Sequence, residues 1–160
     1  DGALRYGALA QPSGLTTDGK FLYVADSEVS AIRRIGLGLS GSIETLLGHD
    51  LFVFGVRDGV GESVLLQHPL GVSYQAGFLY LADTYNHKVK RLNLKTLSCE
   101  TVFGSEVEGD ADFAAQQLFE PGGISMRGSQ GFVADTNHHR LIRFEMLEEK
   151  RVVVEEVMIK

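Results

Sequence analysis

One pattern occurs three times along the chain, and this repetition restricts the possible folds more than any other feature. Each of the three prolines has aspartate and leucine before it, and glycine, aspartate and arginine after it, at the same distances. Repetition at a nearly fixed period is typical of repeat architectures. We therefore divide the chain into three units, residues 1–57, 58–109 and 110–160. The repeated positions are Asp1, Leu9, Pro12, Gly14, Asp26 and Arg34; Asp58, Leu66, Pro69, Gly71, Asp83 and Arg91; and Asp110, Leu118, Pro121, Gly123, Asp135 and Arg143.

Each unit is expected to form four short strands. The chain has 19 glycines but only 3 prolines, a balance typical of tight turns between strands. Four-stranded units of this length are typical of β-propeller blades. We predict an all-β fold of three four-stranded blades, with a turn or two of helix conceivable only within residues 111–119. The expected strands are 15–17, 21–25, 32–35 and 43–47; 72–74, 78–82, 89–92 and 99–103; and 124–126, 131–134, 141–144 and 152–157.

Three blades are too few to close a propeller, which usually needs about four to eight. An open half would expose the apolar faces of its end blades to water, which is unfavourable for large patches. We therefore expect further blades, supplied either by the rest of a longer chain or by a second copy that completes the ring as a homodimer. The chain begins at Asp1 rather than at Met, as an excised or processed piece would. We expect self-association of the isolated chain.

Composition excludes several classes of function. The net charge is −6, from 15 basic and 21 acidic residues, which argues against a nucleic-acid partner because phosphate contacts need clustered Lys and Arg. No apolar run reaches the length of about 18 residues that spans a bilayer, so no membrane partner is expected. The single cysteine, Cys99, excludes an internal disulfide and a CxxC redox pair. With no signal-like segment, a cytoplasmic location is favoured.

Two of the units carry a recognisable motif after their second expected strand. Residues 82–87 read Ala-Asp-Thr-Tyr-Asn-His and residues 134–139 read Ala-Asp-Thr-Asn-His-His, each followed by an apolar residue and arginine. The first unit, with Ala25-Asp26-Ser27-Glu28, is similar but lacks the Asn-His pair. Together with the preceding Pro-x-Gly, these stretches resemble the NHL repeat over essentially the whole chain. The resemblance implies a propeller that is usually six-bladed, so this chain would supply half of it.

A narrower resemblance is to the NHL-repeat-containing protein 2 family, which has bacterial and plant relatives. It rests on residues 10–15 (Ala-Gln-Pro-Ser-Gly-Leu), 51–55 (Leu-Phe-Val-Phe-Gly), 58–61 (Asp-Gly-Val-Gly), 66–72 (Leu-Gln-His-Pro-Leu-Gly-Val) and 120–123 (Glu-Pro-Gly-Gly). The family implies a thioredoxin-like domain followed by six blades. This chain resembles the C-terminal three blades. The thioredoxin-like partner domain and its redox motif are absent from the residues given.

The repeated charged residues and glycines are interpreted as structural, because a residue present in every blade serves what every blade needs. We expect the aspartates to accept backbone N–H groups of the turn that follows the second strand. We expect the arginines to pair with an aspartate or a carbonyl between blades. The structural positions are Asp26, Asp83 and Asp135; Arg34, Arg91 and Arg143; and Gly14, Gly71 and Gly123.

The histidines suggest a metal only weakly. His87 and His139 occupy equivalent positions, and lyases of the NHL class place histidines around zinc. Zinc needs three or four converging ligands, yet the first unit has Ser30 at that position. Neighbouring His138 and His139 would point in opposite directions on a strand. We therefore expect these histidines to make hydrogen bonds within the turn, and we predict no metal and no other cofactor.

The surface most suited to binding is built from the connections between units, residues 48–67 and 104–119. In a propeller these connections share a face with the turns that join the second and third strands, and long loops on a rigid scaffold are where binding usually resides. Phe52 and Phe54 alternate with Val53 and could equally pack over the blade edge. The candidate binding residues are Phe52, Phe54, Arg57, Asp58, Tyr85, Asn86, His87 and His138.

The sequence favours a non-catalytic scaffold that binds a protein or another domain through this face. One alternative is a metal-dependent lyase or hydrolase that uses the central channel. Another is an RNA-binding NHL domain, which would use a basic face, whereas the three units carry net charges of −1, −2 and −3. Metal analysis and RNA binding at several salt concentrations would discriminate among these hypotheses.

Overall fold

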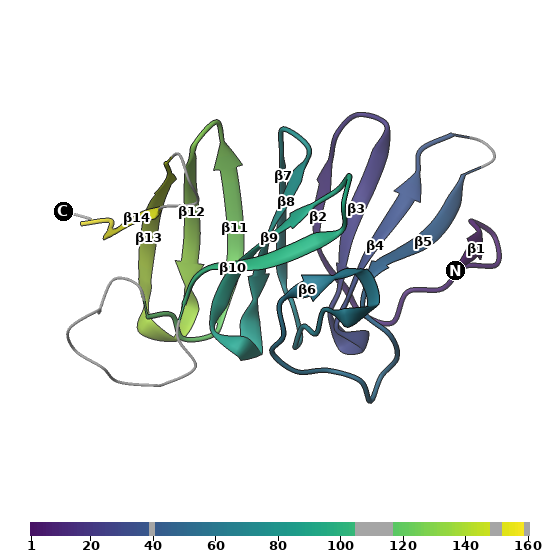
Figure 1. Ribbon diagram of the computed structural model, residues 1–160, viewed down its shortest axis with the longest axis horizontal. Helices are drawn as coiled ribbons and strands as arrows, with labels where there is room; N and C mark the ends of the chain where they lie inside the picture. Colours follow the sequence, from purple (N-terminus) through teal and green to yellow (C-terminus); the bar gives the residue numbers. More distant parts are fainter. Residues whose placement is uncertain (39–40, 105–116, 148–151, 159–160) are drawn as a thin grey trace.

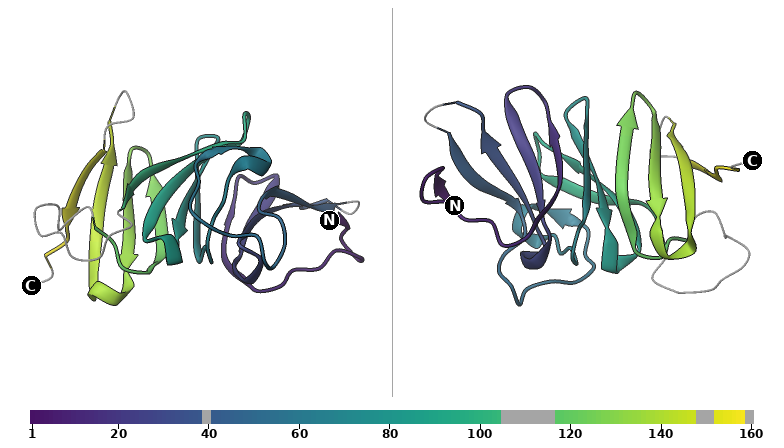
Figure 2. Two further views of the ribbon diagram at one scale, coloured as in Figure 1. Left: turned by 60° about the horizontal axis from the view of Figure 1, so that its bottom comes forward. Right: turned by 180° about the vertical axis from the view of Figure 1, so that it is seen from behind.

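The computed structural model describes residues 1–38, 41–104, 117–147 and 152–158. The described part of the chain forms three antiparallel sheets that stand side by side like a fan, which confirms the prediction of an all-β propeller segment (Figure 1). Their innermost strands neighbour one another, and two further views show the same order of sheets (Figure 2). We refer to the sheets as the first, middle and third blades.

Each blade contains four strands in meander order, as predicted. In the first and middle blades a two-residue strand adds a fifth member at the outer edge. The strands are β2 (Pro12–Thr17), β3 (Phe21–Asp26), β4 (Ala31–Gly36) and β5 (Ser42–Leu47) with β1 (Gly2–Ala3); β7 (Gly71–Gln75), β8 (Phe78–Asp83), β9 (Lys88–Asn93) and β10 (Ser98–Gly104) with β6 (Gly59–Val60); and β11 (Pro121–Arg127), β12 (Gln130–Asp135), β13 (Arg140–Met146) and β14 (Val152–Glu156).

A three-residue 3₁₀ turn joins the second strand of each blade to the third. These turns are η1 (Ser27–Val29), η3 (Thr84–Asn86) and η5 (Thr136–His138), and a fourth, η2 (Gly61–Ser63), lies between the first and middle blades. The residue that ends each of the three recurring turns has a left-handed backbone conformation, although none is glycine: φ is 48° at Ser30, 55° at His87 and 55° at His139. Asp110 and most of the segment 111–119 lie outside the described residues.

Two hydrophobic clusters hold the blades together, one at each junction. Tyr23 and Ile32 of the first blade pack with Leu79 and Leu81 of the middle blade. On its other face the middle blade contributes Tyr80 and Val89, which pack with Phe144 and further residues of the third blade. The middle blade is therefore covered on both faces. The innermost strand β7 starts with three buried residues, whereas most of β2 is exposed.

The repeated glycines mark how closely the innermost strands approach. A Cβ atom at Gly14 would collide with the backbone of the middle blade at Leu70, and one at Gly71 would collide with the backbone of the third blade at Gly122. A Cβ at Gly123 would meet no described atom within 4 Å. Only the first two glycines have a following blade in this chain. Glycine at this repeated position therefore allows close contact between a blade and its successor.

No helix in the described residues is long and apolar enough to cross a membrane.

Candidate functional site

Each blade has a buried aspartate at the end of its second strand, and one carboxylate oxygen accepts a backbone N–H from the segment that leads into the first strand. The bonds are Ala10 and Gln11 N–H to Asp26 at 2.8 Å each, Gln67 N–H to Asp83 at 2.8 Å, and Phe119 N–H to Asp135 at 2.6 Å. The prediction that these carboxylates bond the backbone of the following turn is therefore wrong. Antiparallel pairing of the first two strands brings the earlier segment alongside the carboxylate instead.

The second oxygen of each aspartate meets a different partner in each blade. It accepts from Arg33 at 3.1 Å in the first blade, from Asn86 at 2.8 Å in the middle blade, and from His138 at 2.8 Å and Arg140 at 2.7 Å in the third. Burial raises the pKa of Asp83 to about 6, opposed by Asn86, the Gln67 N–H and the nearby lysines. The aspartates thus fix the architecture of the blade.

The repeated arginines form ion pairs within their own sheets. Each faces a glutamate on the neighbouring fourth strand, as Arg34 with Glu44, Arg91 with Glu100, and Arg143 with Glu155 at 2.8 Å. The expected pairing with an aspartate or carbonyl between blades is therefore wrong, because the opposed strand position already supplies a carboxylate. Bonding to Arg34 lowers the pKa of Glu44, as expected for a carboxylate held by a guanidinium.

Side chains of the 3₁₀ turns bond each blade to its successor. Ser27 donates to the Pro69 carbonyl at 2.7 Å, and Thr84 donates to the Pro121 carbonyl at 2.8 Å. The residues that end the turns, which have left-handed backbone conformations, also bond to the following segment, but as acceptors. Ser30 accepts the His68 N–H and His87 accepts the Glu120 N–H, both at 3.1 Å. The His87 ring is thus part of a blade junction. Within the described residues no three His, Cys, Asp or Glu side chains are grouped so that they could hold a metal ion.

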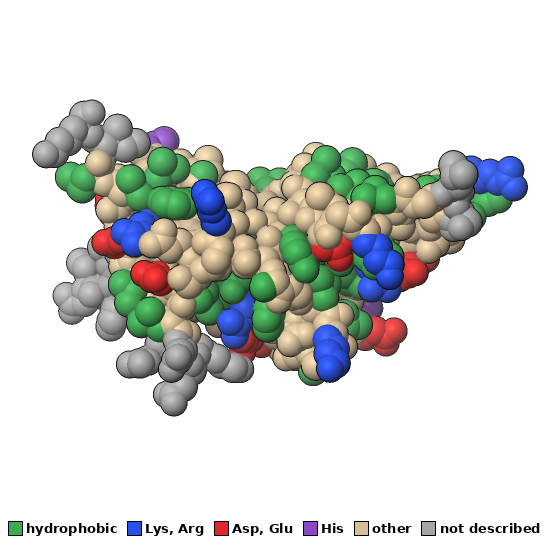
Figure 3. Space-filling model, turned by 90° about the horizontal axis from the view of Figure 1, so that it is seen from above, with side chains coloured by type: hydrophobic (Ala, Val, Ile, Leu, Met, Phe, Trp, Pro, Cys, Tyr) green, Lys and Arg blue, Asp and Glu red, His purple; other side chains and the backbone are tan. Residues whose placement is uncertain are grey.

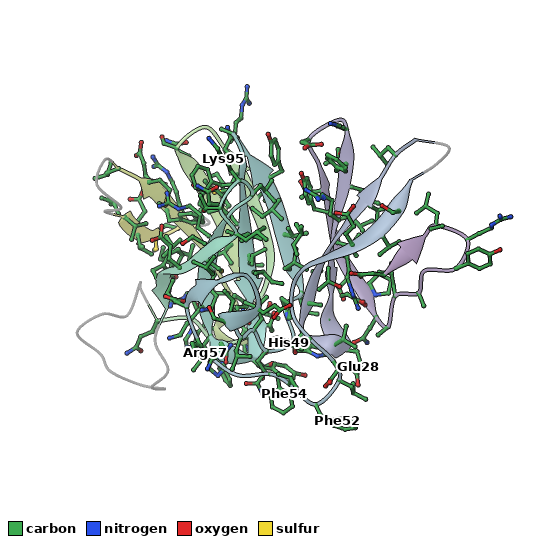
Figure 4. All side chains as sticks on the ribbon, turned by 45° about the vertical axis from the view of Figure 1, so that its right-hand side comes forward. Glu28, His49, Phe52, Phe54, Arg57 and Lys95 are labelled. Atoms are coloured by element: carbon green, nitrogen blue, oxygen red, sulfur yellow. The ribbon has the colours of Figure 1, made fainter. Side chains whose placement is uncertain are left out.

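The turns and the connection of residues 48–67 lie at the same end of the blades, which we call the loop face. Figure 4 shows Glu28, His49, Phe52, Phe54 and Arg57 at this end and Lys95 at the opposite end. Figure 3 looks down on that opposite end, where hydrophobic, basic and acidic side chains are interspersed. The connection is tied to the middle blade, because Asn86 donates to the Gly55 carbonyl at 2.7 Å. Phe52 is 84% exposed and Phe54 is 52% exposed, so neither covers a blade edge.

Of the remaining predicted binding residues, one is an exposed side chain on the loop face and the others form hydrogen bonds within the fold. Tyr85 is 47% exposed on the loop face. Asp58 instead holds the fourth strand of the middle blade, where it accepts from Lys90 and from the Thr101 N–H. Arg57 donates to the Ser63 carbonyl at 2.6 Å. The other residues already described, Asn86, His87 and His138, hold turns or junctions.

A pocket of about 320 Å³ opens on the loop face between the first and middle blades. Its walls come from the first turn with Glu28 and Ser30, from the connection with Leu51, Phe54 and Gln67 and the adjoining His68, and from the middle turn with Tyr85. Of these residues the sequence predicted only Phe54 and Tyr85 as binding residues. Leu51 and Gln67 lie in the predicted connection but were not singled out. Glu28, Ser30 and His68 were missed because the sequence does not show that these segments meet in one pocket.

Two kinds of known protein resemble this chain in sequence. NHL repeat-containing protein 2 of Bos taurus is 41% identical over 161 residues, which cover 91% of this chain and 22% of that protein. Protein SUPPRESSOR OF QUENCHING 1, chloroplastic, of Arabidopsis thaliana is 45% identical over 149 residues, covering 86% of this chain and 14% of that protein. The chain therefore spans about a fifth or less of the length of these relatives. No family model matches the chain.

Solved structures support the fold. A protein of unknown function from Bacteroides thetaiotaomicron aligns with a TM-score of 0.66 at 21% identity, over 84% of this chain and 32% of its own. Virginiamycin B lyase from Staphylococcus aureus aligns with a TM-score of 0.58 at 16% identity, over 94% of this chain and 43% of its own. A chain of the nidogen/laminin complex aligns with a TM-score of 0.62 at 15% identity, over 92% of this chain and 48% of its own. Coverage below one half is what three blades of a six-bladed propeller should give.

Proposed function

Because this chain is homologous to NHL repeat-containing protein 2 and to SUPPRESSOR OF QUENCHING 1, we propose that it is a non-catalytic NHL-repeat scaffold that binds a protein partner through the loop face. The observation that carries this proposal is the exposure of Phe52, at 84%, on a connection anchored to rigid blades. Large exposed aromatic side chains on a fixed framework are typical anchors of protein interfaces. Because so little of its side chain is buried, packing within the fold does not explain why phenylalanine is present at position 52.

The internal roles of the repeated charges also support a scaffold. The aspartates, the arginines and His87 are engaged in bonds within or between blades, so a structural role accounts for these residues. The net charge of −6 disfavours the RNA-binding alternative, because a propeller face that binds phosphates must be basic. The remaining blades of a longer chain, or a second copy, would complete the propeller beside this face.

Site-specific photo-crosslinking tests the proposal. The crosslinking amino acid benzoylphenylalanine would replace Phe52 on the loop face or, as the matched control, Lys95 on the opposite end (Figure 4). In an extract of the source cells we expect a discrete protein adduct from position 52 that excess unmodified chain competes away, and no such adduct from position 95. Adducts of equal yield from both positions, or adducts from position 95 alone, would contradict the loop face as the binding surface.

A further inference from the structure

The pocket between the first and middle blades combines one free acidic group with aromatic walls. We propose that it binds the side chain of an arginine presented by a partner protein, an inference that rests on the proposed scaffold function and names the chemistry that the partner must carry. The pocket volume of about 320 Å³ lies at the lower end of the range typical of ligand pockets, about 300–1,000 Å³. It is therefore suited to one side chain rather than to a large ligand.

Glu28 provides the charge. It lines the pocket and is exposed, and among the described residues it forms no hydrogen bond or ion pair. By contrast, Asp26, two residues earlier, is fully buried and bonded through both oxygens. An apolar ligand would strip water from Glu28 without replacing its hydrogen bonds, and an acidic ligand would be repelled. A cationic group is the ligand that gains most from this carboxylate.

Aromatic rings form another part of the pocket wall. The rings of His68 and Tyr85 stack with centroids 4.6 Å apart and planes inclined by only 10°. Phe54, about half exposed, lines the pocket beside them. A cation above an aromatic face is attracted by the ring quadrupole. The planar guanidinium of arginine can stack on such rings and also make two parallel hydrogen bonds to a carboxylate, which the ammonium of lysine cannot do.

The walls of the pocket are held in place before any ligand arrives. The His68 N–H is bound by Ser30, which ties the connection to the first turn, and Asn86 binds the Gly55 carbonyl, which ties the connection to the middle turn. The arginine of the connection, Arg57, does not line the pocket and donates to the Ser63 carbonyl. A fixed site loses less entropy when it binds its ligand.

The corresponding position at the other blade junction lacks a free carboxylate among the described residues. In the repeat, Glu28 corresponds to Tyr85, Tyr85 to Asn137, and His68 to Glu120. The carboxylate there, Glu120, is already bound by the Asn137 side chain at 2.8 Å. A feature required by the blade architecture would recur at both junctions. Aromatic rings meet at the other junction too, where Phe119 contacts His87 and His138. Among the described residues, the free carboxylate is instead specific to the first junction, as expected of a binding site.

Titration with N-acetyl-arginine methylamide, followed by two-dimensional amide NMR, tests the inference. We expect saturable shifts centred on Glu28, Phe54 and Tyr85. The neutral isostere N-acetyl-citrulline methylamide should produce none. Glu28→Gln should raise the dissociation constant by about fivefold or more, since it removes a charge-assisted bond. Glu62→Gln, the same change outside the pocket lining, should leave the constant within about twofold.

Several results would overturn the arginine site: equal binding of citrulline, no effect of Glu28→Gln in a variant whose spectrum shows it folded, shifts that map elsewhere, or no binding. The crosslinking from position 52 separates these failures from failure of the scaffold itself. If adducts from position 52 persist unchanged with Glu28→Gln, the loop face binds a partner by other chemistry. If position 52 gives no adduct, the scaffold proposal fails regardless of the result of the arginine titration.

Discussion

The middle and third blades have nearly the same strands, but only the middle blade is packed on both faces. The difference is clearest at one repeated position, which faces the following blade. Tyr23 is 2% exposed and Tyr80 is 5% exposed because the next blade covers each of them, whereas Phe132 of the third blade is 45% exposed. The polar contacts follow the same rule. Thr84 and His87 bond the third blade, while among the described residues the Thr136 hydroxyl bonds only the Ala134 carbonyl of its own strand, at 3.4 Å.

This comparison teaches that part of each unit's sequence serves the neighbouring blade rather than its own. The third blade retains an aromatic ring, a threonine and a histidine at the positions that contact a successor, although no successor is present in the 160 residues. Its free face is therefore chemically prepared for another blade. The following experiments either sharpen or break the distinction between covered and uncovered faces, starting with the largest expected effect.

Leu79→Ala should cause the largest loss of stability. Leu79 is fully buried at the junction between the first and middle blades, so truncation should lower the free energy of unfolding by about 2–5 kcal/mol. Leu22, its counterpart on the first blade, is only half-buried, and Leu22→Ala should cost less than about 1.5 kcal/mol. Urea unfolding measures both. Equal losses would mean that the first blade is covered as fully as the middle one.

Thr84→Val should reduce stability by about 1–3 kcal/mol, because it leaves the buried Pro121 carbonyl without its hydrogen bond. Thr136→Val is the matched control, and its effect should stay within about 0.5 kcal/mol. The same urea unfolding curves give both values at low protein concentration. A cost for Thr136→Val as large as for Thr84→Val would show that the third blade has a successor in solution.

Phe132→Asp should weaken self-association. We expect the 17.5 kDa chain to form a species of twice that mass at high concentration, because the free blade faces are apolar. A charge at Phe132 should raise the dissociation constant about tenfold, or about 1.4 kcal/mol. Sedimentation equilibrium measures this constant, and Phe52→Asp on the loop face provides the control that should not change it. A well-folded monomer at high concentration would contradict the prediction.

Cys99 should show the smallest effect, an absence of labelling. It is buried in the fourth strand of the middle blade, and burial raises the pKa of its thiol to about 12, so almost no thiolate exists at neutral pH. We expect negligible reaction with a disulfide reagent until urea unfolds the chain. Phe132→Cys combined with Cys99→Ala should react at the rate of an exposed thiol in dilute protein. Rapid labelling of native Cys99, or protection of the introduced thiol, would contradict the comparison.

The repeat was sufficient to predict the blades. Apolar runs such as 78–82 are bounded by turn residues and recur at matching positions, so local preference and long-range order agree. The two-residue edge strands were missed because pairs such as Gly59 and Val60 carry no periodic pattern. The left-handed residues at Ser30, His87 and His139 were also missed, because none is glycine and the motif alone does not reveal backbone angles.

The side-chain partners were less predictable than the strands. The glutamates that pair with the arginines follow them at unequal distances, since the turns between the third and fourth strands differ in length; compare Arg34 and Glu44 with Arg143 and Glu155. The partner of each buried aspartate also differs, Arg33 in the first blade, the neutral Asn86 in the middle blade and Arg140 in the third. The pocket escaped prediction because its walls come from segments that the sequence does not show to meet in space. Binding specificity in a repeat protein is best sought at positions like Glu28 that break the pattern.

The bonds between blades join the same positions at both junctions: the turn of one blade bonds the proline segment of the next, with donors on both sides. A unit therefore carries one set of groups for its successor and the complementary set for its predecessor. A tandem duplication of the gene segment for one unit would produce a new neighbour whose contacts are complementary from the outset. Families built in this way can change their number of units without evolving a new contact surface, which leaves selection free to alter the residues of single turns.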